Sequence, residues 1–141
     1  MIRGFDVEQG KLTLAMAEEL KKDKILSAPV WSQFVKTGPA NDRIPSQRDW
    51  WFLRGAGILR RFYVDHKPLG VNRLRTTYGN KTKNTYAGKH FKLAGGAIIR
   101  KILQQLEAAQ FIKKAKVGNH YGRLITPKGI AFVDKVAKNQ R

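Results

Sequence analysis

The spacing of apolar residues along the chain is helical in most places. The clearest case is residues 94–109, where a single stripe contains Ile98, Ile99, Ile102, Leu103 and Leu106. Similar patterns predict helices over residues 11–23, 30–36, 50–64 and 71–78. In the first of these, Glu18 is placed to pair with Lys22.

The period becomes strand-like late in the chain. Residues 111–117 and 121–126 surround Gly118, Asn119 and His120, which predicts a β-hairpin. A last helix over residues 127–138 is expected to have Thr126 as its N-cap and Pro127 in its first turn. Helix, loop, helix and hairpin is the order of a winged helix-turn-helix. We therefore predict a mainly α fold of this type, with additional N-terminal helices and a small C-terminal hairpin wing, in one domain of residues 1–141.

Turn-forming residues place the helix ends and the loops. Asp49 is expected to cap the helix over residues 50–64, which Pro68 and Gly70 end. Gly79 is expected to supply a left-handed residue after residues 71–78. Residues 37–48 and 79–92 are rich in turn formers and predict loops.

The charge balance limits the choice of partner. Of 141 residues, 28 are Lys or Arg and only 10 are Asp or Glu, a formal charge of +18. With 42% hydrophobic residues the chain is expected to fold, and a folded domain with this excess repels itself unless a polyanion neutralises it. Nucleic acid is the expected polyanion, and an anionic membrane surface is the rival.

The sequence has no sign of cysteine chemistry, of a membrane span or of a secretion signal. Cysteine is absent, which excludes disulfides, thiolate catalysis and zinc sites built on sulfur. No apolar run is long enough to cross a bilayer, and the N-terminus does not have the pattern of a secretion signal. We therefore expect a protein of the cytoplasm or of a nucleic-acid compartment.

The helix over residues 50–64 divides into two faces at 100° per residue. The side expected to be core contains Trp51, Phe52, Gly55, Ile58, Leu59 and Phe62; the opposite side contains Arg54, Gly57, Arg60 and Arg61, with Trp50 near them. An arginine fork grips phosphate oxygens, and a glycine lets a nucleic-acid backbone approach closely.

The alternative is a solvated face with glycines at close helix crossings. From Trp50 to Leu106, however, twelve Lys and Arg stand against one acid, Asp65, and this favours a nucleic-acid surface. The role of Trp50, in the core or stacked on a base, stays open.

Residues 79–92 contain no acid and little that can build a core. A flexible surface loop is the plain interpretation. In so basic a chain we expect the segment to be ordered by phosphates and by packing of Tyr86 or Phe91. On the helix over residues 94–109, the residues off the apolar stripe, as in a recognition helix, are Arg100, Lys101, Gln104 and Gln105.

Catalytic patterns are incomplete. Residues 55–60, Gly-Ala-Gly-Ile-Leu-Arg, lack the third glycine of a dinucleotide fingerprint and have no strand before them. Gly88 and Lys89 resemble the end of a phosphate loop without its first glycine. His66, His90 and His120 show no metal-ligand spacing. We predict no enzyme, cofactor or metal site.

Over nearly its whole length the chain resembles the S19e family of small-subunit ribosomal proteins of eukaryotes and archaea. The resemblance rests on Asp49-Trp50-Trp51 followed by Arg54, Leu59-Arg60-Arg61, Gly70-Val71, Tyr78-Gly79, His90-Phe91, Gly95, Ile99-Arg100, Gln105-Leu106-Glu107, Gly122-Arg123, Thr126-Pro127-Lys128-Gly129 and Asp134. It implies a helical winged-helix protein bound to ribosomal RNA in the small-subunit head and needed for the maturation of that subunit. It also implies that Arg54, Arg61 and Arg100 face RNA. The chain departs from the family at Gly55-Ala56-Gly57, where alanine and serine are usual, and at Gly96, where serine is usual.

The prediction is therefore a non-enzymatic constituent of cytoplasmic ribosomes. Its partners are small-subunit ribosomal RNA and neighbouring ribosomal proteins, with no membrane or small-molecule substrate, and it is a monomer outside the ribosome. The predicted RNA-binding residues are Arg54, Gly57, Arg60, Arg61, Lys67, Arg73, Arg75, Lys81, Lys83, Lys89, His90, Lys92, Arg100 and Lys101. A winged-helix DNA-binding regulator or chromatin protein is the alternative, although the chain leaves little room for a dimer face or a sensing domain. A membrane-surface protein would need an exposed apolar helix face.

Overall fold

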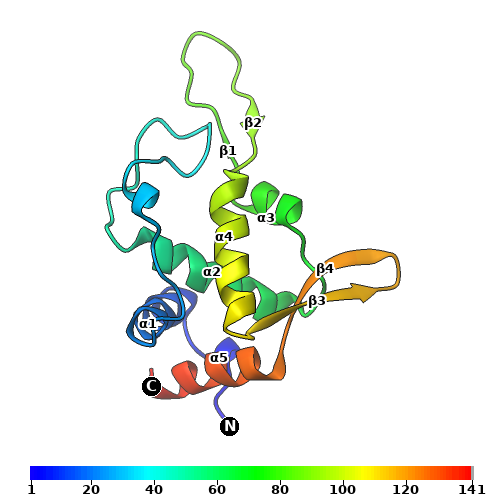
Figure 1. Ribbon diagram of the computed structural model, residues 1–141. Helices are drawn as coiled ribbons and strands as arrows, with labels where there is room; N and C mark the ends of the chain where they lie inside the picture. Colours follow the sequence, from blue (N-terminus) through cyan, green and yellow to red (C-terminus); the bar gives the residue numbers. More distant parts are fainter. Residues whose placement is uncertain (141) are drawn as a thin grey trace.

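The structure of the protein is a computed structural model that describes residues 1–140. It is mainly helical, with two small β-hairpins (Figure 1). The helices are α1 (Gln9–Lys22), α2 (Trp50–Asp65), α3 (Val71–Thr77), α4 (Gly96–Ala108) and α5 (Pro127–Asn139), with short 3-10 helices η1 (Gly4–Asp6) and η2 (Val30–Gln33). The strands are β1 (Asn80–Lys81), β2 (Phe91–Lys92), β3 (Ile112–Val117) and β4 (His120–Ile125). Within residues 1–140, no helix is long and apolar enough to span a bilayer.

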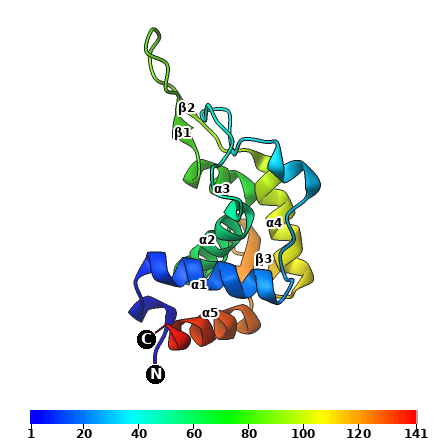
Figure 2. The same ribbon diagram turned by 90° about the vertical axis from the view of Figure 1, so that its left-hand side faces the viewer.

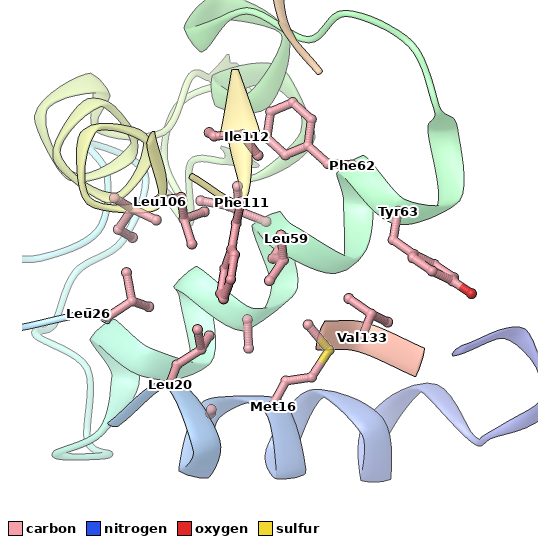
Figure 3. Close-up of a cluster of buried hydrophobic side chains, with 14 of the residues drawn as sticks. Met16, Leu20, Leu26, Leu59, Phe62, Tyr63, Leu106, Phe111, Ile112 and Val133 are labelled. Carbon is pink, nitrogen blue, oxygen red and sulfur yellow. The ribbon is translucent and has the colours of Figure 1, made fainter. Parts of the chain in front are cut away.

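The hydrophobic core contains residues from all five helices and from the base of the β3–β4 hairpin (Figure 3). α1 and α5 both pack against α2, with the N-terminus beside α5 (Figures 1 and 2). Trp51 and Phe62 of α2 are completely buried, as are Met16 of α1 and Ile102 of α4. The core face predicted for α2 is confirmed, except that Phe52 is only half-buried.

The β3–β4 hairpin, which we call the wing, lies where a hairpin was predicted, and its pairing is fully defined. Ile112 pairs with Ile125 at the base and Val117 with His120 at the tip, so His120 lies in a strand and not in the turn. Gly118 has a φ of 61°, which a hairpin turn with glycine at its first central position requires. Leu69 and Arg123 exchange two backbone hydrogen bonds of 3.0 Å, and these join the wing to the α2–α3 connection.

Residues 79–92 form a second, narrow hairpin rather than the predicted loop without strands. Lys81 pairs with Phe91, and the Thr82 amide donates to the His90 carbonyl at 2.9 Å. The hairpin rises from the helical body as an arm (Figures 1 and 2). The prediction that Gly79 is left-handed is wrong, because its φ is not positive. Glycine is required there for space, since a Cβ would lie 2.6 Å from the Lys92 carbonyl oxygen.

Several local predictions need correction. Asp49 is the residue before α2, but its side chain makes no capping hydrogen bond; it accepts from Lys21 at 3.0 Å. Lys22 pairs with Glu19 at 3.7 Å instead of Glu18. In the first case a lysine of α1 takes the carboxylate, and in the second the carboxylate three residues before Lys22 replaces the one four residues before it. The helix predicted over residues 30–36 is only the four-residue η2. Thr126 caps α5 as predicted, accepting from the Gly129 amide at 3.2 Å.

The N-terminal segment is tied to the core by one hydrogen-bonded junction. The Tyr63 hydroxyl donates to Asp134 Oδ1 at 2.6 Å, and the Gly4 amide donates to the Tyr63 oxygen at 3.1 Å. A Cβ on Gly4 would lie 2.9 Å from the Tyr63 ring, so only glycine fits. Burial and the Asp134 hydrogen bond raise the pKa of Tyr63 to about 12. This junction joins η1, α2 and α5 far from the arm.

Candidate nucleic-acid interface

Arg54 of α2 lies over the ring of Tyr78, the residue that follows α3, and Arg60 and Arg61 lie about two turns further along the same helix. The guanidinium carbon of Arg54 is 4.2 Å from the centroid of that ring. Burial raises the pKa of Tyr78, and the positive charges of the three arginines oppose this shift. Such an electrostatic effect on one phenol requires nearby cations. Arg54 therefore contacts Tyr78 directly, whereas Arg60 and Arg61 act on it only through their charge.

Arg54 is held in place before any ligand binds. Burial lowers the pKa of its guanidinium, but an arginine stays charged at physiological pH. Stacking on the face of Tyr78 fixes the plane of the guanidinium fork. A side chain that is already ordered loses less entropy when it binds a phosphate.

Gly57 has a steric role that the sequence did not indicate. A Cβ at this position would lie 3.2 Å from the Tyr78 hydroxyl oxygen. The missing side chain thus makes room for Tyr78, which in turn supports Arg54. The neighbouring Gly55 is buried, and a Cβ there would collide with the Leu26 side chain. Gly55 thus leaves space for Leu26, which lies in the segment after α1 and not in a crossing helix as the alternative interpretation supposed.

Arg61 and Asp65 form an ion pair one turn apart on α2. Arg61 Nε lies 2.8 Å from Asp65 Oδ2, although the two groups are not aligned for a hydrogen bond. Arg60 is half-buried, and its Nε atom is buried without a hydrogen-bond partner within residues 1–140. Among the ion pairs of residues 1–140, the Arg61–Asp65 pair is the only one that includes a predicted RNA-binding residue. Among residues 1–140, Arg54 and Arg60 thus have no carboxylate within ion-pair distance, whereas Arg61 is paired.

A groove runs beside the arginines, with a volume of about 650 Å³. Its walls come from the loop before α2, from one face of α2 and from the base of the arm. The lining residues are Thr37, Asn41, Asp42, Arg43, Pro45, Gln47, Trp50, Leu53, Arg54, Gly57, Tyr78 and Lys83. Cations, aromatic rings and amides in one concave surface match the groups of a nucleotide, which has a phosphate, a π-face and hydrogen-bonding edges.

The position of Trp50 is now defined. Its ring lies edge-on to Trp51, with the centroids 5.6 Å apart, and it is half-buried. Trp51 is the core residue of the pair, and its indole N–H donates to Gln105 Oε1 at 3.2 Å. Trp50 therefore contacts the core on one side and lines the groove on the other.

The arm adds several exposed basic residues. The predicted residues Lys81, Lys83, Lys89, His90 and Lys92 all lie on it and are exposed. Tyr86 is fully exposed and Phe91 is half-exposed, so neither is used in the core. The arm base is joined to the loop before α2 by a hydrogen bond of 3.4 Å from Asn80 to Asn41.

Arg75 differs from the other predicted residues because it has a structural role. Its Nε donates to the Ala94 carbonyl at 2.8 Å, and the Ala94 amide donates to the Arg75 carbonyl at 3.1 Å. These bonds close the base of the arm. A Cβ on Gly96 would lie 3.3 Å from Arg75 Cδ and 3.5 Å from Arg100 Nη2, so this glycine leaves space for both arginines.

The remaining predicted residues do not line the groove. Lys67, Arg73 and Lys101 are exposed, on the α2–α3 connection, α3 and α4 respectively. Gln105 is not a free surface residue: it bonds Trp51 and donates to the Ser27 carbonyl at 2.8 Å. Gln104 is exposed, as expected.

Two basic groups were not predicted from the sequence. Arg43 lines the groove from a loop whose path only the fold decides. The wing carries Lys113, Lys114 and Lys116, all exposed. The absence of any acid from residue 108 to residue 125 was a usable signal for them.

The chain was compared with known proteins. It matches the family of ribosomal protein S19e over residues 4–141. Similar proteins include the small ribosomal subunit protein eS19 of Aeropyrum pernix, which is 40% identical over 139 residues, 98% of this chain and 89% of the relative. The small ribosomal subunit protein eS19G of Ascaris suum is 38% identical over 136 residues, 96% and 90% of the two chains. The eS19 protein of Mya arenaria is 36% identical over 132 residues, 94% and 86%.

The match covers nearly the whole chain and nearly the whole of each relative. The family is a structural and not an enzymatic one, and its proteins are found in the ribosomes of the cytoplasm. These findings confirm the resemblance that the residue motifs indicated. The chain belongs to the ribosomal protein S19e family of small-subunit ribosomal proteins.

Proposed function

We propose that this chain binds ribosomal RNA in the head of the small subunit and supports subunit assembly and ribosomal RNA maturation. It acts as one domain, without cofactor or metal, and is a monomer outside the ribosome. Its partners are ribosomal RNA and the neighbouring proteins of the subunit. The family supports a ribosomal constituent, and the basic surface supports RNA as the direct ligand.

The observation that carries the proposal is Arg54, stacked on Tyr78 at the wall of the groove, with Arg60 and Arg61 about two turns further along the same helix. Like charges that share a helix repel each other unless an anion lies between them. An RNA backbone supplies phosphates along its length, so one strand can neutralise Arg54 and Arg60, while Asp65 holds Arg61. The groove next to them has the size and the aromatic wall to receive an unpaired nucleotide.

We also propose that the fold is a winged helix. α3 and α4 stand where the two helices of a helix-turn-helix are expected, and β3 and β4 follow α4 as the wing. The usual connection between two such helices is a turn of three or four residues. Here the arm occupies that position. The arm thus begins between the two helices that would contact nucleic acid, and its basic residues extend that surface.

Binding is expected to be mainly to the backbone and steeply salt-dependent. Each phosphate neutralised by Lys or Arg releases a condensed counterion. Each such contact steepens the plot of log affinity against log salt by about 0.7 to 0.9. The exposed cations of the arm add contacts once the RNA is bound. Base readout contributes less, because A-form helices are recognised by shape and 2′-hydroxyls.

The test is the salt dependence of binding to a transcript of the small-subunit RNA head domain. Arg54→Ala and Arg60→Ala should each flatten the slope by about 0.7 to 0.9. The matched control is Lys138→Ala, an exposed cation at the end of α5 on the opposite side from the arm. Circular dichroism verifies that each variant keeps its helices.

Two outcomes would overturn the proposal. One is an equal change in slope for the control and the groove variants, because binding would then depend only on net charge. The other is preferred binding of duplex DNA over the structured RNA in direct competition, which would favour the DNA-binding regulator. Gel filtration of the free protein tests the monomer.

A further inference from the structure

The β3–β4 wing carries a concentration of positive charge that the groove does not use. Between Ile112 and Ile125 there are four cations, Lys113, Lys114, Lys116 and Arg123, and no acid. The wing projects sideways from the helical body, whereas the arm rises from its top (Figure 1). The two basic hairpins therefore present separate surfaces.

The strand register decides which wing residues share a face. Side chains of directly paired residues lie on the same side of a two-stranded sheet, and the side alternates along each strand. Lys114 pairs with Arg123, and Lys116 pairs with Tyr121. These four residues consequently lie on one face, with the buried pair Ile112 and Ile125 at its base.

This face stores electrostatic repulsion. Like charges directly opposite each other destabilise a β pair, and Lys114 stands opposite Arg123. Glu107 of α4 compensates only the inner position, where its carboxylate lies 3.4 Å from Arg123 Nε. Among residues 1–140, neither Lys114 nor Lys116 has a carboxylate within ion-pair distance.

The outer part of the face is arranged to meet a ligand. Tyr121 is 73% exposed, and Lys116 Nζ lies 4.8 Å from the centroid of its ring. A shallow hollow of about 410 Å³ runs between Lys114, Lys116, Tyr121 and Arg123. Lys114 and Lys116 are two residues apart on a strand, roughly 7 Å, which is close to the step between successive phosphates of one nucleic-acid strand.

We propose that this face of the wing is a second RNA-binding surface, on which Lys114 and Lys116 bind successive phosphates and Tyr121 packs against a ribose or base. The inference rests on the proposed function and deepens it, because the chain then grips ribosomal RNA at two separate places. An anionic ligand relieves the repulsion across the strands. RNA is favoured over a membrane surface because the face has cations and one tyrosine but no apolar cluster to insert.

The experiment compares a wing variant with a matched control in the full chain. Lys114→Gln and Lys116→Gln together remove two wing charges; Lys135→Gln and Lys138→Gln remove two exposed charges from α5. Against the head-domain transcript, the wing variant should flatten the logarithmic salt slope by about 1.4 to 1.8, twice the value for one phosphate contact. The control should change it little. The wing variant should unfold at the same or a slightly higher temperature, since it loses a repulsive pair.

Lysine acetylation of the RNA complex, followed by mass spectrometry, locates the contact. Lys114 and Lys116 should be protected by the transcript, and Lys135 should not. If the Arg54 and Arg60 variants flatten the slope but the wing variant does not, and the wing lysines are acetylated freely, the second surface is refuted while the proposed function stands. If none of the variants changes the slope, both proposals fail. Protection of the wing lysines in whole subunits but not in the RNA complex would assign the surface to a protein neighbour and also refute the proposal.

Discussion

The proposed function predicts that Asp65 competes with RNA for Arg61, so that replacing Asp65 should strengthen binding. It is the only acid between Trp50 and Leu106, and its carboxylate holds the Arg61 guanidinium at 2.8 Å. Asp65→Asn keeps the shape of the side chain but releases Arg61. The freed arginine can then bind a phosphate as Arg54 and Arg60 are proposed to do. An acid-to-amide change near a binding site is thus expected to raise the affinity.

The size of the effect follows from one additional phosphate contact. The logarithmic salt slope should steepen by about 0.7 to 0.9. Extrapolated from a 1 M reference, this corresponds to roughly sixfold tighter binding at 0.1 M salt and roughly twofold at 0.4 M. The free energy of unfolding should change by no more than about 0.5 kcal/mol. Loss of the ion pair between neighbouring turns is offset because Asp65 is the last residue of α2, where the helix dipole disfavours a carboxylate.

The assay is a filter-binding or fluorescence-anisotropy titration with the head-domain transcript at five or more salt concentrations. Asp23→Asn is the control, because it makes the same chemical change at an exposed residue after α1, on the α5 side of the molecule. Equal steepening in both variants would mean that net charge, and not the release of Arg61, governs binding. Weaker binding by Asp65→Asn would refute the reasoning directly, since Asp65 would then be an organising residue of the site.

Three further predictions concern the scaffold. The Tyr63 pKa is raised to about 12 in the folded state, so the folded protein keeps the phenol proton above pH 10. The protonated phenol therefore adds about 2 to 3 kcal/mol to the free energy of unfolding below pH 10, and this amount is lost between pH 10 and 12. Denaturant unfolding at several alkaline pH values should therefore show a decline that Tyr63→Phe reduces. Gln105→Ala leaves the buried Trp51 indole N–H without its acceptor, and should lower the free energy of unfolding by about 1 to 3 kcal/mol while the RNA salt slope stays the same. Gly122→Ala places a Cβ 2.8 Å from the Leu69 backbone and should cost about 1 to 3 kcal/mol; an unchanged melting temperature would show that the wing is not held there.

Local patterns in the sequence indicated most of the elements and the excess of positive charge. Apolar residues at helical spacing fixed α1, α2, α4 and α5 to within a few residues, because a helix must bury its stripe whatever it packs against. Thr126 and Pro127 marked the start of α5 because a cap acts within one turn. The charge of +18 indicated a polyanion without any knowledge of the fold. The local errors, at Asp49, Glu18 and Gly79, all arose where a residue distant in sequence or one turn away competed for the side chain or the space.

Only the tertiary structure decided how the charges are grouped. Arg54 and Tyr78 come from different helical segments, and nothing in their spacing indicates that one stacks on the other. The groove requires the loop before α2, the helix and the arm base to converge, so Arg43 and Trp50 became part of it through packing alone. In the same way the wing register, and not composition, placed Lys114 opposite Arg123. Periodicity and capping act over a few residues along the chain, whereas electrostatic and steric contacts depend on distance in space. That distance is set only when the helices and hairpins pack around the core.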